Sequence, residues 1–345
     1  MEMLKDYGLF LAKAITIVVA IVFIVRGLIA AVQHEREAGR DKITVKKLNR
    51  HYEYLHDVLQ EEMSSHFERK QFAKAKKQQW KEEKKQAKEG GQPEKKKVFV
   101  LNFKGDIKAS AVSSLREEVT AVLTVAKASD EVVVRLESSG VVVHAYGLAA
   151  TQLQRFKRKQ IPLTIAVDKV AASGGYLMAC AADRILAAPF AIVGSIGVIS
   201  QVPNFNRLLR KHDIDYEELT AGEYKRTLSI FGEVTEKGRQ KFLEQLEDVH
   251  TSFKEFLQEN RAQVEIKDVA TGEYWYGKRA LELKLVDELI SSDDYLFAAN
   301  ETCDIYEVTY KSKETLRDKL AAGMEESLRR IYYFLWKREE ESRYV

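Results

Sequence analysis

The chain has 345 residues, a formal net charge of +3 and two cysteines, Cys180 and Cys303. This length accommodates a full-sized catalytic domain together with additional segments. Two cysteines provide neither a disulfide framework nor the spacing of a metal site, so we expect both to be buried, small apolar residues. Much of the positive charge lies before residue 98, and the small net charge gives no indication of a nucleic-acid partner.

The most apolar stretch is residues 9–32, whose only charges are Lys13 and Arg26 near its ends. As a helix it is roughly 36 Å long, which is enough to cross a bilayer. A cleaved signal peptide is the alternative, but no clear small-residue cleavage site is present, so we expect residues 1–33 to be an uncleaved membrane anchor. Lys5 is the only basic residue before the span, whereas six basic residues follow it closely. The positive-inside rule therefore favours a cytoplasmic location for the rest of the chain.

Residues 34–97 have the composition of a charged stalk or linker. Apolar residues recur at helical spacing in its first part, which indicates a helix, whereas residues 69–97 are dense in lysine, glutamate and glutamine. Such a segment buries too little apolar surface to fold alone. Its four histidines match no metal motif, and we expect them to be solvated; they are His34, His51, His56 and His66.

Residues 98–310 alternate short apolar runs with segments of helical periodicity, which predicts an α/β domain with a largely parallel sheet. The expected strands are residues 98–103, 132–136, 163–167, 184–188, 216–219 and 304–310, and the expected helices are residues 112–127, 146–157, 176–182, 205–211 and 235–261. The C-terminal segment, residues 311–345, contains a further amphipathic helix at residues 315–337.

Small residues surround Ser173 in the turn between an expected strand and an expected helix. A serine in this position either caps the helix or is a nucleophile, because the free amides and the dipole at a helix N-terminus stabilise a developing oxyanion. In parallel sheets, ligands bind beyond the carboxyl ends of the strands. The loops at residues 138–141 and 169–175 both fall there, which favours a chemical role for Ser173, although this stretch alone leaves both interpretations open.

A nucleophilic serine needs a general base, and the chain offers several candidates. His144, His212 and His250 lie in the domain, but none follows a small-residue turn or has an evident orienting carboxylate. Lys225 directly follows a glycine-containing turn, and Ser–Lys pairs are a known variant of the catalytic triad. A lysine base requires surroundings that keep its amine neutral. The spacing alone does not select one of these residues.

Three motifs, in this order, resemble the signal peptide peptidase A family of membrane serine peptidases. They are Ala-Ala-Ser-Gly-Gly-Tyr at residues 171–176, Gly-Ser-Ile-Gly-Val at residues 194–198 and the pair Tyr224-Lys225. The resemblance covers most of residues 98–310, and the anchor, charged stalk and single catalytic unit are most similar to the SohB-type proteases of the family. It implies a ClpP/crotonase-like α/β fold that uses no cofactor and no metal.

The same resemblance implies a role for each site residue. Ser173 is the nucleophile and Lys225 is the general base, while Ser195 hydrogen-bonds the lysine and orients it. The backbone amides of Gly174 and Gly140 are the oxyanion donors. The family also assembles ring-like homo-oligomers, in which the serine and the lysine come from neighbouring subunits.

One loop departs from the family pattern of Ser-Pro-Gly-Gly, because this chain has Ser-Ser-Gly-Val at residues 138–141. Loss of the proline frees the loop, and Val141 replaces a glycine where a substrate needs room or where φ is positive. We therefore expect the Gly140 donor to survive, and Ser139 and Val141 to weaken the activity or abolish it.

These features predict a membrane-anchored serine endopeptidase of the bacterial inner membrane, which cleaves peptides or membrane-derived protein fragments through an acyl-enzyme intermediate. A catalytically impaired membrane scaffold of the same fold is the alternative. An acyl-CoA enzyme of the crotonase type is a third interpretation, which the Ser–Lys motifs disfavour. The expected partners are a peptide or protein substrate, membrane lipid around residues 9–32 and further copies of the chain, with no nucleic acid.

Overall fold

The computed structural model describes residues 42–88, 95–106, 108–140 and 142–311. The stretch Thr44–Thr309 forms one compact unit. The predicted membrane anchor at residues 9–32 and the predicted C-terminal helix at residues 315–337 lie outside the described residues. Within the described ranges, no helix combines the length and the apolar character that crossing a membrane requires.

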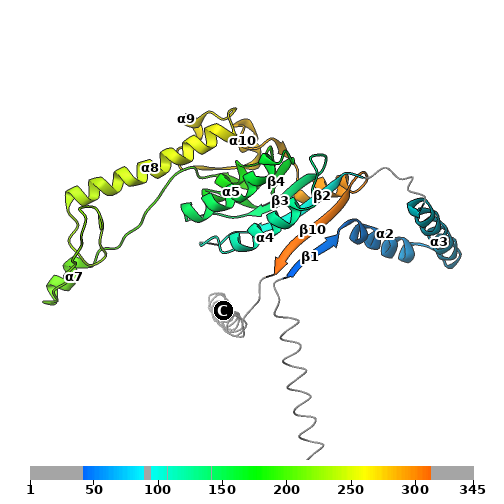
Figure 1. The fold of residues 1–345 in the computed structure, drawn as a ribbon, viewed down its shortest axis with the longest axis horizontal. Helices are drawn as coiled ribbons and strands as arrows, with labels where there is room; N and C mark the ends of the chain where they lie inside the picture. The colour runs from blue at the N-terminus through cyan, green and yellow to red at the C-terminus, as the bar shows by residue number, and fades with distance from the viewer. Residues whose placement is uncertain (1–41, 89–94, 107, 141, 312–345) are drawn as a thin grey trace, which may run out of the picture. The chain divides into compact units, whose positions relative to one another are not determined.

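A seven-stranded sheet forms the centre of the described part of the chain (Figure 1). Its strands are β1 (Lys42–Lys47), β2 (Lys97–Lys104), β3 (Glu131–Glu137), β4 (Leu163–Val167), β6 (Arg184–Ala187), β9 (Glu288–Leu289) and β10 (Asp304–Lys311). They lie in the order β1-β10-β2-β3-β4-β6-β9, and every neighbouring pair from β10 to β9 is parallel. This confirms the predicted α/β class with a largely parallel sheet. Val132, Val133 and Val134 of β3 are fully buried, as expected for a parallel sheet that is covered on both faces.

A smaller sheet carries the serine-containing turns. Its three strands in the described residues are β5 (Val170–Ala172), β7 (Ile192–Gly194) and β8 (Tyr274–Tyr276). Strand β5 runs parallel to β7, and β7 runs antiparallel to β8. The two strands that precede Ser173 and Ser195 are therefore direct neighbours.

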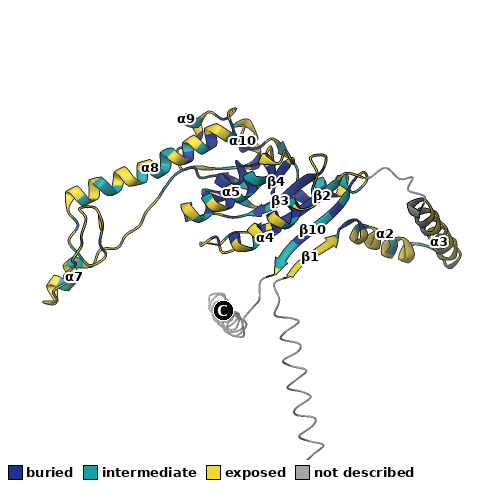
Figure 2. Cartoon of the chain, viewed as in Figure 1, coloured by how far each residue is buried: buried dark blue, intermediate teal, exposed yellow. Residues whose placement is uncertain are grey.

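Helices at the predicted places connect the strands. They are α4 (Val112–Leu123), α5 (Val143–Arg158), α6 (Gly174–Ala179), α7 (Asn206–Lys211) and α8 (Glu236–Asn260). The other described helices are α2 (Asn49–Met63), α3 (His66–Lys88), α9 (Ile266–Val269), α10 (Gly277–Glu282) and α11 (Ser292–Ala299). Figure 2 shows that buried residues concentrate in the central strands, whereas the first half of α8 is largely exposed.

Two parts of the chain differ from the sequence-based predictions. The prediction of a strand at residues 216–219 is wrong, because this stretch has no regular secondary structure. Among the described residues, no neighbouring strand pairs with its backbone. Conversely, β1 extends the main sheet although it precedes residue 98, the predicted start of the domain. Asn49 fixes this addition, since its side chain donates to the Cys303 carbonyl and accepts from the Ile305 amide at 2.7 Å.

The two cysteines are buried free thiols, as predicted. Burial raises the pKa of the Cys180 thiol to about 12, so this side chain is neutral and packs as a small apolar group. Within the described residues, no group of histidine, cysteine or carboxylate side chains is arranged to hold a metal ion.

Arg261 ties the end of α8 to the body of the unit. Its guanidinium donates to both carboxylate oxygens of Asp287, at 2.7 and 2.9 Å. Asp287 also accepts from the Ile185 amide of β6 at 2.7 Å, and Tyr176 of α6 donates to the Leu285 carbonyl at 2.8 Å. The Arg261 side chain is 2% exposed. This pair, in which Arg261 is buried and Asp287 is partly exposed, therefore fixes α8 beside the strand and the helix that support the serine turn.

We expect Arg261→Met to lower the free energy of unfolding by roughly 3 kcal/mol, because it leaves the Asp287 carboxylate without its cationic partner. Arg239→Met is the matched control, since Arg239 and Glu236 form a solvent-exposed pair at 3.8 Å that contributes little. Urea denaturation followed by circular dichroism measures both variants. Equal losses of stability in the two variants would contradict this anchoring role.

Candidate active site

Ser173 lies in the sharp turn between β5 and α6, with φ +52° and ψ −123°. A non-glycine residue in this region of backbone space is strained, and such strain concentrates at functional sites. The Ser173 N–H donates to the Gly194 carbonyl at 2.7 Å, which holds the turn against β7. The Ser173 side chain makes no capping hydrogen bond to α6. The helix-cap interpretation is therefore wrong, and the residue instead lines a cleft.

Ser195 occupies the equivalent position after β7, with φ +53°. Because β5 and β7 are parallel and Ala172 pairs with Gly194, the two serines follow the ends of neighbouring strands. The Ser195 N–H donates to the Glu273 carbonyl at 2.6 Å. Ser173 and Ser195 line the same cleft, which has a volume of about 560 Å³. The structure thus brings these two predicted site residues together.

Small and apolar residues form most of the wall of this cleft. The described residues that line it are Ser139, Gly140, Val143, Ser173, Ser195, Gly197, Val198, Ile199, His250, Ala270, Thr271 and Gly272. His250 is the one ionisable side chain among them. Ser139 of the loop that departs from the family pattern is part of the wall, whereas Val141 lies outside the described residues.

The loop before α5 passes over the N-terminus of α6 at a distance that only glycine permits. Gly140 has φ +59°, and a Cβ atom there would lie 2.3 Å from the Gly174 nitrogen and 2.6 Å from the Gly175 nitrogen. A Cβ atom on Gly175 would lie 2.4 Å from the Ser138 carbonyl oxygen. The first amides of a helix have no acceptor within the helix. The close packing therefore places the Gly140 backbone against amides of this kind, directly after Ser173.

A series of hydrogen bonds fixes this loop. The Gly140 N–H donates to Ser138 Oγ at 3.1 Å, Ser138 Oγ donates to the Tyr146 hydroxyl at 2.7 Å, and that hydroxyl donates to the Asp106 carbonyl at 2.7 Å. Burial raises the pKa of Tyr146, which keeps its hydroxyl protonated as a donor. The sequence did not indicate Ser138 or Tyr146 as site residues, because Tyr146 resembles any apolar position of an amphipathic helix. The series also engages the Gly140 amide, the predicted oxyanion donor.

Lys225 lies in a different part of the unit, in the arm, which we define as residues 199–235. Its side chain is exposed, and its N–H donates to the Gly222 carbonyl at 3.1 Å within the predicted turn. Glu223, two residues before Lys225, forms an ion pair with Lys237 in the first turn of α8. Lys225 is not among the described residues that line the cleft. Within one chain, the structure therefore does not place the predicted base in the cleft with the predicted nucleophile.

His250 of α8 is a cleft residue for which the sequence suggested no orienting carboxylate. Its Nδ1 atom lies 3.9 Å from Glu247 Oε2, and its Nε2 atom is buried without a hydrogen-bond partner among the described residues. Residues three apart on a helix are neighbours, so the spacing of Glu247 and His250 on the predicted helix was the available signal. His144 and His212, the other histidine candidates, are not among the described residues that line the cleft.

Comparisons with known proteins identify the class of this α/β protein. The profile "Peptidase family S49 N-terminal" matches residues 2–153, and the profile "Peptidase family S49" matches residues 155–305. The chain therefore belongs to the peptidase family S49.

Two relatives of the chain are named as probable proteases. The chain is 45% identical over 333 residues to "Probable protease SohB" of Haemophilus influenzae, with 94% of each chain covered. It is 51% identical over 244 residues to "Probable protease SohB" of Buchnera aphidicola subsp. Acyrthosiphon pisum, which covers 70% of this chain and 73% of the relative. Among solved structures, the 1510-N membrane-bound stomatin-specific protease in complex with a substrate peptide matches with a TM-score of 0.37 and 16% identity, covering 67% of this chain and 98% of that chain.

We expect Gly140→Ala to reduce peptidase activity by about 10²-fold or more, because the added Cβ atom pushes the loop away from the start of α6. Gly147→Ala is the matched control: it lies on α5, where a Cβ atom meets nothing within 4 Å, and alanine in a helix interior is favourable. Values of kcat/KM on one fluorogenic peptide compare the two variants. Full activity of Gly140→Ala would show that this close approach is dispensable.

Proposed function

We propose that the chain is a serine endopeptidase in which the Ser173 hydroxyl attacks the peptide carbonyl while a general base takes the hydroxyl proton. The base passes this proton to the leaving amine as the peptide C–N bond breaks, and an acyl-enzyme ester remains. Water then attacks the ester, releases the acyl product and restores the hydroxyl. The strained turn of Ser173, whose side chain lines the cleft and does not cap α6, is the observation that carries this proposal. Membership of the peptidase family S49 supports the same reaction.

The N-terminus of α6 stabilises the oxyanion in this mechanism. The Gly174 amide is the first donor, because it lies in the first turn of the helix, where amides lack an internal acceptor and the dipole favours negative charge. The Gly140 amide is the second donor, since its residue packs against Gly174. This amide also donates to Ser138 Oγ, so its contribution depends on the loop turning toward the substrate.

Lys225 of a neighbouring copy is the general base in this proposal. The described lining of the cleft contains no lysine, whereas Lys225 is exposed on the arm. The arm presents a group of large apolar side chains to solvent, and such groups are typical of interaction surfaces. Four of them are more than half exposed: Ile199, Leu208, Ile214 and Leu219. Association through the arm buries these side chains and delivers Lys225 to Ser173, where Ser195 orients it.

The proposed substrates are peptides or membrane-derived protein fragments. Residues 9–32 anchor the chain in a bacterial inner membrane, with the catalytic domain on the cytoplasmic side. The apolar length of this segment and the six basic residues that follow it closely support the anchor and its orientation.

A catalytically impaired scaffold of the same fold is the second candidate function. It is favoured by the loop, where Ser139 and Val141 depart from the family pattern and Ser138 Oγ engages the Gly140 amide. A fluorophosphonate probe that reacts with nucleophilic serines distinguishes the two functions. Labelling that Ser173→Ala abolishes supports the peptidase, whereas a folded wild-type protein without labelling supports the scaffold.

We expect Lys225→Ala to lower kcat/KM by at least about 10²-fold, because the variant lacks the base that takes the proton from Ser173. Lys225→Arg should lose as much activity, since a guanidinium stays protonated. Lys211→Ala is the control, because Lys211 is also an exposed lysine of the arm. Near wild-type rates for Lys225→Ala would contradict the proposal and would make His250, the ionisable side chain in the described lining of the cleft, the leading candidate for the base.

A further inference from the structure

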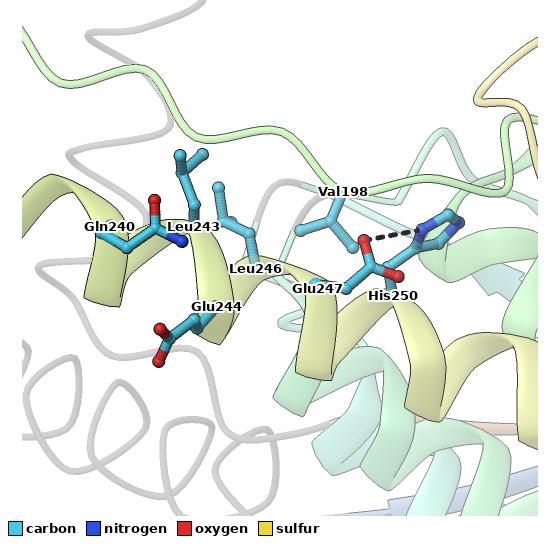
Figure 3. A pocket seen from close by; sticks show the side chains of 7 residues that line it. All are labelled: Val198, Gln240, Leu243, Glu244, Leu246, Glu247 and His250. Atoms are coloured by element: carbon cyan, nitrogen blue, oxygen red, sulfur yellow. Dashed lines mark ion pairs between the residues drawn. The ribbon is translucent and has the colours of Figure 1, made fainter.

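The cleft that contains Ser173 continues into a second groove along α8. This groove has a volume of about 420 Å³, and it shares two wall residues, Val198 and His250, with the Ser173 cleft. Its remaining lining residues all come from α8 and are Gln240, Leu243, Glu244, Leu246 and Glu247. In Figure 3, Leu243, Leu246 and Glu247 lie on the side of the helix that faces the Val198 segment. The groove thus adjoins the candidate active site.

Val198 is the described residue that forms the opposite wall of the groove, and it belongs to a segment with an unpaired backbone. Residues 197–202 follow Ser195 without regular secondary structure. Their amides and carbonyls make no backbone hydrogen bond to the described residues. An extended peptide can pair with a backbone edge of this kind while its side chains enter pockets beside it. A peptide segment that leaves Ser173 therefore finds main-chain partners beside Val198, where the cleft and the groove meet.

Glu247 is the acidic side chain at the end of this groove that adjoins the Ser173 cleft. Its carboxylate lies between Val198 and His250 in Figure 3. A hydrogen bond from Lys254 at 3.0 Å lowers the pKa of Glu247, so the carboxylate is ionised at neutral pH. The pair is solvent-exposed, with 66% of the Glu247 side chain accessible. Exposed pairs of this kind are weak, so an incoming cation can replace Lys254.

We propose that the α8 groove is a recognition subsite for a basic side chain of the substrate, which pairs with Glu247 while neighbouring apolar residues of the peptide pack on Val198, Leu243 and Leu246. This inference rests on the proposed peptidase function of the Ser173 cleft. It names the substrate class as peptides in which a lysine or arginine adjoins an apolar run.

The geometry of the groove predicts which position of the substrate carries the basic residue. Gln240 and His250 are ten residues apart on α8, which corresponds to about 15 Å along the helix. An extended peptide advances about 3.3 Å per residue, so the groove accommodates four to five residues beyond the cleft. Glu247 is three residues from His250, or about 4.5 Å along the helix, so the preferred basic residue is expected one to two residues beyond the part of the peptide that fills the Ser173 cleft.

The test compares fluorogenic decapeptides that share one apolar sequence and carry a single lysine or a single glutamate, moved position by position away from the scissile bond. We expect the lysine peptide to be cleaved about threefold to tenfold better, as kcat/KM, at one position in this range. Glu247→Lys should reverse the ratio. Glu255→Lys should leave it unchanged, because Glu255 is an exposed residue of α8 that lines neither cavity. The ratio of kcat/KM for the lysine peptide to that for the glutamate peptide should also fall toward one in 1 M NaCl, where exposed charges are screened.

Several outcomes would overturn the inference while leaving the peptidase intact. One is a lysine-to-glutamate ratio of one at every position in a protein that labels at Ser173, and another is an unchanged ratio in Glu247→Lys. A third is that Glu247→Lys changes the oligomer mass in analytical ultracentrifugation and slows all peptides equally, which would make the groove a contact between copies. If neither labelling nor cleavage occurs, the peptidase proposal fails instead. Fluorescence anisotropy of the same labelled peptides then tests whether the groove binds a basic side chain. Equal binding of the lysine and glutamate peptides would contradict the inference.

Discussion

The close approach of two backbones organises the candidate site. The loop at Gly140 rests on the first amides of α6, and its Cα carries no side chain because any Cβ atom would overlap with the Gly174 nitrogen. The same contact explains why Gly175 is also required, since its Cα faces the Ser138 carbonyl. The Ser138 and Tyr146 hydroxyls then fix the loop to the Asp106 backbone. A strained serine next to the first amides of a helix is the local arrangement that acyl transfer requires.

The ends of two parallel strands position the serines of the site. The described lining of the cleft contains no lysine that could be the general base. Ser173 and Ser195 meet because β5 and β7 are adjacent and in register. Lys225 belongs to the arm, whose apolar side chains lack a buried environment within the described part of the chain. One physical explanation covers both observations. In the proposed mechanism, the arm is a surface for a second copy, and the contact that buries its apolar residues also brings the missing amine to the serine.

The sequence predicted most of the fold, because local patterns determine the elements of a parallel α/β sheet. The buried valines of β3 and the small residues around Ser173 carried that information. The strand predicted at residues 216–219 failed because a strand needs a partner, which a local pattern does not reveal. The sequence did not predict the roles of Ser138 and Tyr146 for a similar reason. These roles depend on the hydrogen bond from Tyr146 to Asp106, which is 40 residues away in the sequence. The positions of Lys225 and His250 relative to the cleft likewise depended on tertiary structure.

Catalysis by this mechanism requires that Ser173 of one copy works with Lys225 of another. Mixing Ser173→Ala protein with Lys225→Ala protein, after dissociation and reassociation of the subunits, tests this requirement most directly. Where a Lys225→Ala chain supplies the serine and a Ser173→Ala chain supplies the lysine, a complete site forms. We predict recovery of about a quarter of wild-type activity in a random equimolar mixture with such head-to-tail contacts. A mixture that stays inactive, although both variants co-assemble with wild-type subunits, would contradict a shared site.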